Sequence, residues 1–243
     1  VLTAEYSDLW KEDKKTETNE VMFALQHSAK HKIASNYGKS YYPSDYSPNA
    51  GWADYYGNED FFKAYPNDDR KEWNYMTEWK IKSGEIIPYT ESADKLPAIS
   101  KYYDYDEGAP GKSAQSNGIT CIYRYAEVLL MYAEASTRAT NSVNQDALNA
   151  IQEVQKRAGY QNRQIELTTT TEPAAFLAAV SNERGWEFFA EMKRWFELVR
   201  LEKVKEVRAE EWDASTFNTN HHYYFPVPYQ QVDLAGWTNN AGY

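Results

Sequence analysis

Two glutamates, Glu183 and Glu187, stand four residues apart in a segment rich in charged and aromatic side chains. On a helix both carboxylates would share one face, and a pair of close carboxylates is the catalytic unit of retaining glycosidases. However, Arg184, Arg194 and Arg200 are near in the sequence, and partly buried Glu–Arg pairs that hold helices together give the same pattern. We therefore expect a structural role for both glutamates. A glycoside hydrolase is the alternative, and it requires an open cleft at these carboxylates.

Three other groups of side chains have metal-ligand character. His27 and His31 have helical spacing, but the segment lacks the glutamate of a zinc-binding H-E-x-x-H motif. The acidic residues of segment 104–107 resemble part of a calcium loop, but Ala109 stands where an EF-hand requires glycine. The acidic segment 67–69 is a weaker candidate of the same kind. We expect no cofactor, with calcium as the alternative.

Aromatic residues are concentrated in one part of the chain. Between Tyr37 and Trp79, 13 of 43 residues are Tyr, Trp or Phe, against 16% in the whole sequence. The same segment is rich in Pro, Gly, Asn and Asp, which is typical of turns and long loops. Disordered segments are poor in aromatic residues, so we expect an ordered loop region in which binding residues concentrate.

Sugar rings have apolar faces and polar edges, so aromatic side chains beside Asn and Asp are typical of sugar sites. The densest such group surrounds Trp52 and Tyr55. The alternative is that these rings only pack the loop onto the rest of the fold. The predicted ligand-binding residues are Tyr46, Asn49, Trp52, Asp54, Tyr55, Tyr56 and Asn58.

The second half of the chain has the periodicity of helices. Apolar residues recur at helical spacing over 122–133 and 147–158, and Gly159 stands where a helix C-cap glycine belongs. A third helix is predicted to begin after an N-cap at Thr171 and to reach residue 191. Residues 21–27 favour a buried strand, and the prolines of the C-terminal tail favour an extended segment.

These patterns predict a mainly α fold with little β structure. We expect a loop-rich and aromatic-rich region over residues 1–118, which would hold the ligand site. We expect a helical region with an extended tail over residues 119–243. Alternating small and large apolar residues, as in YAEVLLMYAEA, favour helix pairs packed as in tetratricopeptide repeats.

Composition excludes several classes of function. The net charge is −10 and the pI about 5.0, which argues against nucleic-acid binding and against contact with an anionic membrane surface. Cys121 is the single cysteine of the sequence and has apolar neighbours, so we expect it in the core rather than in catalysis. No apolar segment approaches the roughly 20 residues that span a bilayer. The first ten residues do not have the pattern of a signal peptide.

Four segments in order resemble the motifs of the SusD/RagB family. They are RYAEVLLMYAEA at 124–135, AIQEVQKRAG at 150–159, ERGWEFFAEMKRWFELVR at 183–200 and FPVPYQQVDLAGWTNNAGY at 225–243. Shorter resemblances lie at 20–26, 69–70 and 101–103. The chain departs from the family pattern at Glu197, where the family has Asp, and at Ala241, where it has Pro.

The resemblance implies a tetratricopeptide-type helical scaffold and a non-enzymatic protein that binds glycans at the cell surface. It implies a lipoprotein of the outer membrane of Bacteroidetes and delivery of the ligand to a SusC-like TonB-dependent transporter. Family members are about twice this length, so we expect the signal and the lipid-bearing cysteine to lie outside this chain. The alternatives are capture of peptide or another nutrient by the same architecture, and a helical-repeat scaffold that binds proteins.

Overall fold

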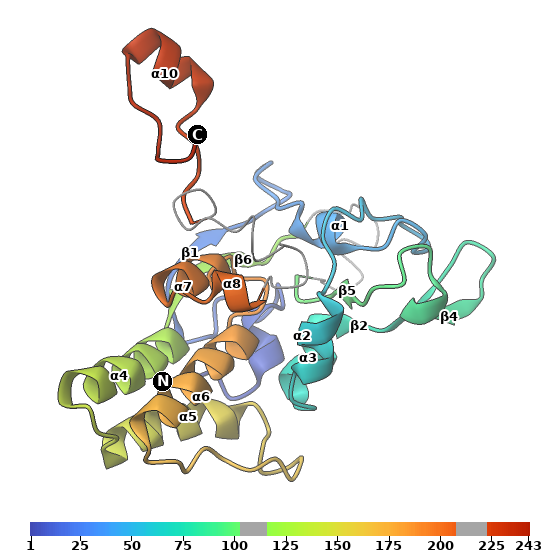
Figure 1. The fold of residues 1–243 in the computed structure, drawn as a ribbon. Coiled ribbons are helices and arrows are strands. Elements are labelled where there is room, and N and C mark those ends of the chain that lie inside the picture. Colours follow the sequence, from blue (N-terminus) through green and yellow to red (C-terminus); the bar gives the residue numbers. More distant parts are fainter. Residues whose placement is uncertain (103–115, 208–222) are drawn as a thin grey trace. The chain divides into compact units, whose positions relative to one another are not determined.

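The computed structural model describes residues 1–102, 116–207 and 223–243. It divides into two compact units, residues 1–191 (unit 1) and residues 192–243 (unit 2). Helices form most of the regular structure, and the strands are few and short (Figure 1). The predicted mainly α fold with little β structure is therefore confirmed.

Three helices build the largest core of unit 1. They are α4 (Tyr125–Thr140), α5 (Gln145–Arg157) and α6 (Pro173–Glu187), which lie side by side (Figure 1). Small residues on α4 let the helices approach closely, because alanine adds no bulk between them. The fully buried apolar residues of this core are Ala126, Leu130, Ala133, Ala147, Ile151, Val154 and Phe176.

The ends of these helices follow local capping chemistry. Asn144 caps α5, and its side chain accepts a hydrogen bond from the Ala147 amide at 2.8 Å. The cap of α6 is Glu172, which accepts from the amides of the first turn, so the predicted cap at Thr171 is wrong by one residue. Pro173 follows in the first turn, where its missing N–H costs nothing. The helix ends at residue 187 and not at 191.

Gly159 follows α5 with a φ of +85°, as its predicted role requires. A Cβ at this position would lie 2.2 Å from Asp69 Oδ2. We expect Gly159→Ala to lower the free energy of unfolding by about 1–3 kcal/mol, because it adds this clash to an unfavourable φ. Urea unfolding would measure the loss. Gly84→Ala is the control, since Gly84 has a φ of +95° and an added Cβ would meet nothing closer than 4.0 Å. Equal losses in both variants would contradict the clash.

The two halves of unit 1 share a strand pair. β1 (Val21–Gln26) runs antiparallel to β6 (Ile119–Arg124), and β6 leads directly into α4. The helix predicted from Ile122 onward therefore begins later, at Tyr125, because Ile122 belongs to β6. The pairing joins residues on both sides of the expected boundary between residues 118 and 119. That division into two regions stays a prediction.

The loop-rich part of unit 1 contains only short elements. Its helical turns are η1 (Tyr6–Leu9), α1 (Tyr37–Tyr41), α2 (Glu59–Ala64), α3 (Asp69–Asn74) and η2 (Tyr89–Glu91). Two strand pairs, β2 (Tyr75–Met76) with β5 (Ala98–Ile99) and β3 (Glu78–Lys80) with β4 (Ile86–Pro88), complete it. A second core forms here from Tyr6, Leu9, Trp10, Tyr41, Ile99, Tyr102, Ile119 and Cys121. The predicted core position of the cysteine is confirmed.

Unit 2 contains α7 (Arg194–Arg200), α8 (Val204–Val207) and α10 (Tyr229–Ala235). The tail was expected to be extended, yet seven of its residues form α10. Pro226 and Pro228 precede the helix instead of interrupting it, and proline is tolerated before a first turn.

Candidate functional site

The two glutamates of the hydrolase alternative lie on α6 and are fully buried. Arg70 donates from Nη1 to Glu183 Oε1 at 2.6 Å and to Glu187 Oε2 at 2.8 Å. Tyr160 donates its hydroxyl to Glu183 Oε2 at 3.1 Å. The hydrolase alternative required these carboxylates to line an open cleft, and their burial against Arg70 leaves that requirement unmet for this pair. The expected structural role of the pair agrees with this geometry.

A second arginine, Arg124, occupies the centre of the same buried region. It donates to Glu20 Oε1 at 2.8 Å and to both carboxylate oxygens of Glu191, at 2.8 and 3.0 Å. It also donates to Glu187, as does Arg157. The buried ionic cluster, as we define it, consists of Glu20, Asp68, Arg70, Lys101, Arg124, Arg157, Glu183, Glu187 and Glu191.

The pKa values of this cluster reflect competition between burial and opposite charge. Burial would raise the pKa of Glu187, but the guanidinium groups of Arg157, Arg124 and Arg70 outweigh it and hold the pKa well below the usual range. Burial dominates at Glu183, whose pKa is raised even though Arg70 is in contact. The cluster thus brings five carboxylates and four cations together in the interior, and every carboxylate contacts at least one of the cations. This arrangement holds together segments that are distant in the sequence, and it is not suited to binding a ligand.

The predicted ligand loop folds back on α1 through its backbone. Trp52 N donates to Lys39 O at 2.8 Å, and Asp54 N donates to Ser40 O at 2.9 Å. Gly51 lies so close to Tyr42 that a Cβ would be 2.0 Å from the Tyr42 carbonyl oxygen. Only glycine fits this contact, so the path of the loop past α1 is fixed by the sequence.

Two of the predicted residues present aromatic rings at the surface. Trp52 is 51% exposed and Tyr55 is 61% exposed, so each ring offers an apolar surface to a ligand. The Tyr55 ring contacts Tyr41 with centroids 5.7 Å apart, and Tyr41 stacks on Tyr102 at 5.9 Å with planes 16° apart. The exposed ring is therefore anchored to the second core through buried rings.

Trp52 also has a partner on α1. Lys39 Nζ lies 5.4 Å from the Trp52 ring centroid, within the range of a cation–π contact. Burial raises the pKa of Tyr41 to about 12, so its hydroxyl stays neutral. Asp54 lies exposed between the two rings in the sequence, where its carboxylate can accept hydrogen bonds. The result is a pair of supported aromatic rings with an exposed carboxylate nearby in the sequence.

Three of the other predicted residues make internal contacts. Tyr56 is half-buried and donates its hydroxyl to Asp94. Asn58 caps α2 by accepting from the Phe61 amide at 2.9 Å. Tyr46 is half-buried against Met76, Trp79 and Ala98, and Asn49 is half-buried as well. Their contact with a ligand stays a prediction.

Sequence reasoning missed the residues that support the two exposed rings. Lys39 and Tyr41 belong to α1, and Tyr102 lies more than forty residues further along the chain. The density of tyrosines around residue 41 was a signal for the first of these contacts. The Tyr41–Tyr102 stack depends on tertiary structure and had no local signal.

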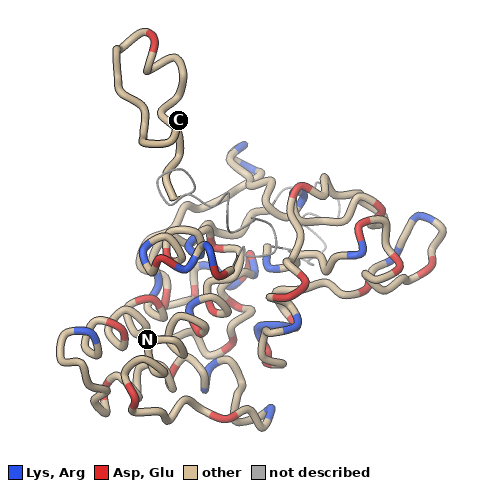
Figure 2. The backbone as a smooth tube through the Cα atoms, viewed as in Figure 1, with Lys and Arg blue, Asp and Glu red and all other residues tan. Residues whose placement is uncertain are grey.

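Several residues weighed as metal ligands have other partners, and others lie outside the described residues. The ring nitrogens of His27 lie 2.7 Å from Thr120 Oγ1 and 3.2 Å from Ile33 O. In the acidic segment 67–69, Asp68 binds Arg70 within the ionic cluster and Asp69 binds Arg163. The calcium alternative at 104–107 lies outside the described residues. Figure 2 shows Lys and Arg interspersed with Asp and Glu along the described chain, without a separate basic tract there.

Comparison with known sequences places this chain among SusD-like proteins. The sequence pattern of the SusD family matches residues 77–243. SusD-like protein P2 of Formosa agariphila is 28% identical over 200 residues, which cover 74% of this chain and 39% of that protein. SusD-like protein P25 of the same species is 27% identical over 144 residues, covering 57% of this chain and 26% of that protein. The matched segments thus cover well under half of each of these relatives.

Solved structures share the fold. A SusD superfamily protein from Parabacteroides distasonis superposes with a TM-score of 0.79 at 23% identity, covering 100% of this chain and 54% of that one. Surface glycan-binding protein A from Bacteroides thetaiotaomicron, in complex with laminarihexaose, gives 0.73 at 22% identity, covering 99% and 56%. The family pattern covers more than half of the sequence and the fold covers all of it: the chain belongs to the SusD family.

Proposed function

We propose that this chain is part of a non-enzymatic receptor that binds a glycan at the cell surface, with Trp52 and Tyr55 as its sugar-binding rings. The observation that carries the proposal is the exposure of these two rings, each held in place by a partner on α1. A preformed aromatic surface binds the apolar face of a sugar without losing conformational entropy. Asp54 accepts hydrogen bonds from the hydroxyls.

The SusD fold supports a sugar as ligand, since surface glycan-binding protein A shares that fold and was solved with laminarihexaose. Burial of Glu183 and Glu187 supports binding without cleavage. Within the described residues, no helix is long and apolar enough to cross a membrane. By analogy with the family, the whole protein is a surface lipoprotein of the outer membrane, and it delivers its ligand to a SusC-like TonB-dependent transporter.

We expect Trp52→Ala and Tyr55→Ala each to weaken glycan binding about tenfold, because each removes one central aromatic contact. A glycan array with the folded chain would identify a ligand, and calorimetry would give its Kd with each variant. Trp237→Ala is the matched control, since Trp237 has a similar exposure of 58% but belongs to unit 2.

Binding without cleavage, weakened by the two loop variants and unchanged by the control, is the expected result. A glycan that binds all variants equally would move the site away from the loop. A ligand found only among peptides would replace the glycan by the peptide alternative. Product release from the bound glycan would contradict a non-enzymatic role.

A further inference from the structure

Helix α4 has apolar side chains on two opposite sides. Its inner stripe, Ala126, Leu130 and Ala133, is fully buried in the helical core. Successive residues of a helix are rotated by about 100°, so a second stripe lies about 180° from the first. A helix that is apolar on both sides is suited to a position between two layers, and unit 1 supplies one of them. The outer stripe, as we define it, consists of Val128, Met131, Tyr132, Ala135 and Ala139, all of them exposed.

The neighbouring helix α5 has the usual pattern of one buried and one solvated side. Its exposed positions opposite the core are polar, namely Asn149, Glu153 and Lys156. On α4 the equivalent positions are apolar, and Met131 and Tyr132 are 51% and 44% exposed. Single exposed apolar residues are common, but residues at helical spacing touch one another and form a continuous patch. The outer stripe is therefore apolar area that a second layer would remove from water.

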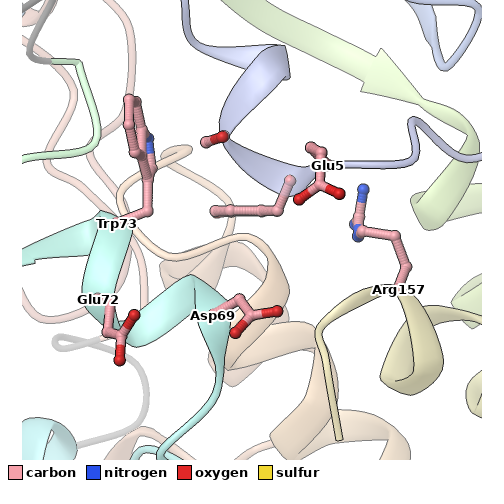
Figure 3. Close-up of a pocket in the computed structure, with 7 residues that line it drawn as sticks. Glu5, Asp69, Glu72, Trp73 and Arg157 are labelled. Carbon is pink, nitrogen blue, oxygen red and sulfur yellow. The ribbon is translucent and has the colours of Figure 1, made fainter. Parts of the chain in front are cut away.

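A polar cavity in unit 1 contrasts with this stripe, because charges of both signs line it. The cavity has a volume of about 220 Å³ and lies between η1, α3 and the end of α5, where Figure 3 shows the side chains of Glu5 and Arg157 facing each other. Asp69 and Glu72, which also line it, bind Arg163. Such a lining favours neither a cation nor an anion. The outer stripe of α4 has one chemical character and therefore selects an apolar partner.

The shape of the outer stripe fits another helix. It is one helix wide and follows α4 from residue 128 to residue 139, a length of about 17 Å. The convex surface of a helix offers no pocket for a small molecule. Ala135 and Ala139 allow a close approach, whereas the longer side chains of Met131 and Tyr132 fit between the residues of an opposing helix, as ridges fit into grooves.

The area of the outer stripe decides between a separate molecule and the same polypeptide. A footprint of about 17 Å by about 10 Å amounts to about 170 Å², whereas a standard interface takes about 800 Å² from each partner. Separate molecules also lose translational and rotational freedom when they associate. The stripe is too small to hold a second copy by itself. A helix of the same polypeptide avoids most of this cost, because its tether gives a high effective concentration.

The matched relatives are long enough to supply such a helix. The Parabacteroides distasonis protein matches 100% of this chain, but only 54% of that protein is matched. We propose that a helix from a part of the full gene product outside these 243 residues packs along the outer stripe, with its own apolar side facing Val128, Met131 and Tyr132. Helix α4 then lies between two helical layers. The proposal concerns the scaffold and does not depend on glycan binding.

Maleimide labelling of introduced cysteines tests this contact. Met131→Cys places a thiol in the outer stripe, and Glu153→Cys, on the polar side of α5, is the matched control. Cys121 is buried, and peptide mass spectrometry separates its signal from the others. Each variant is made in this chain and in the full gene product. We expect Met131→Cys to react about tenfold more slowly in the full gene product, where only local opening exposes it, and Glu153→Cys to react equally in both.

Met131→Gln provides a second measurement. It should lower the urea midpoint of the full gene product and leave that of this chain nearly unchanged, because the side chain is buried only in the former. Circular dichroism shows whether each variant is folded. Equal labelling of Met131→Cys in the two proteins would overturn the proposal, as would a gene product no longer than this chain. Protection already present in this chain would also overturn it: dependence on protein concentration would identify a second copy, and independence would identify a segment of this chain.

Discussion

Replacing Arg124 with methionine should lower the free energy of unfolding by about 3–5 kcal/mol, because it leaves several buried carboxylates without their main cation. Arg124 is fully buried and contacts Glu20, Glu187 and Glu191. Methionine keeps an apolar stem of similar length, so the loss reports charge more than volume, including the contact of the Arg124 guanidinium carbon with the Phe188 ring centroid at 4.5 Å. Urea unfolding followed by circular dichroism would measure it.

Arg138→Met is the matched control on the same helix. Arg138 pairs with Glu134 at 2.8 Å, but half of its side chain is exposed, and exposed i,i+4 pairs contribute only about 0.3–0.5 kcal/mol. The loss in Arg124→Met should also be smaller at pH 5 than at pH 7. Without Arg124 the pKa values of Glu187 and Glu191 rise, so the folded variant gains stability by binding protons as the pH falls. Equal losses in the two variants would show that the cluster contributes no more than a surface pair.

The helical core could be predicted from the sequence because its signals are local. An apolar period of 3.6 residues, a cap at Gly159 and the Glu134–Arg138 pair each depend on residues within one or two turns. The structure bears out all three. The predicted start of one helix was wrong, because Ile122 continues the apolar pattern of α4 but belongs to the preceding strand β6.

The partners of the buried glutamates could not be predicted in this way. Nearness in the sequence suggested Arg184, Arg194 and Arg200, but Arg184 pairs with Glu127 at 3.6 Å. The true partner of Glu183 is Arg70, 113 residues earlier in the chain. Sequence spacing can identify an ion pair within a helix, but a contact over such a distance depends on how the segments pack. The family resemblance located these residues without revealing that they meet.

The segments that resemble the SusD family meet in this cluster. Residues 20–26 supply Glu20, residues 101–103 supply Lys101, and the helical motifs supply Arg124, Arg157 and the glutamates of α6. The residues that identify the fold therefore hold its distant segments together. The exposed rings of the loop lie outside every one of these motifs, which is expected if the scaffold is shared and the ligand site varies.

Loop residues were harder to assign, because one residue type serves two purposes. Asn58 was predicted to bind ligand, yet it precedes Glu59 and Asp60, and Asn followed by acidic residues is also a helix start. The structure uses it as the cap of α2. Trp52 and Tyr55 have no such local role, and they are the two predicted residues whose rings remain most exposed.

Lys101 gives the second large effect, through pH. It is fully buried, it donates from Nζ to Glu191 at 2.7 Å and to Phe189 O at 2.7 Å, and Trp10 and Tyr6 flank it. Burial lowers its pKa from 10.5 to about 8, against the attraction of Glu191 and with help from Arg124. Between pH 8 and 10.5 the unfolded chain binds more protons than the folded one, so the contribution of Lys101 to stability rises with pH.

We therefore expect the unfolding free energy of the unchanged chain, minus that of Lys101→Met, to increase by about 2–3 kcal/mol from pH 7.5 to pH 10.5. Taking the difference removes the titration of tyrosines, which both proteins share. Lys30→Met, at an exposed position, should give a difference that stays nearly constant over this range. A constant difference for Lys101→Met as well would mean that Lys101 stays protonated. The ion pair with Glu191 would then outweigh burial, and the cluster would hold four permanent cations instead of three.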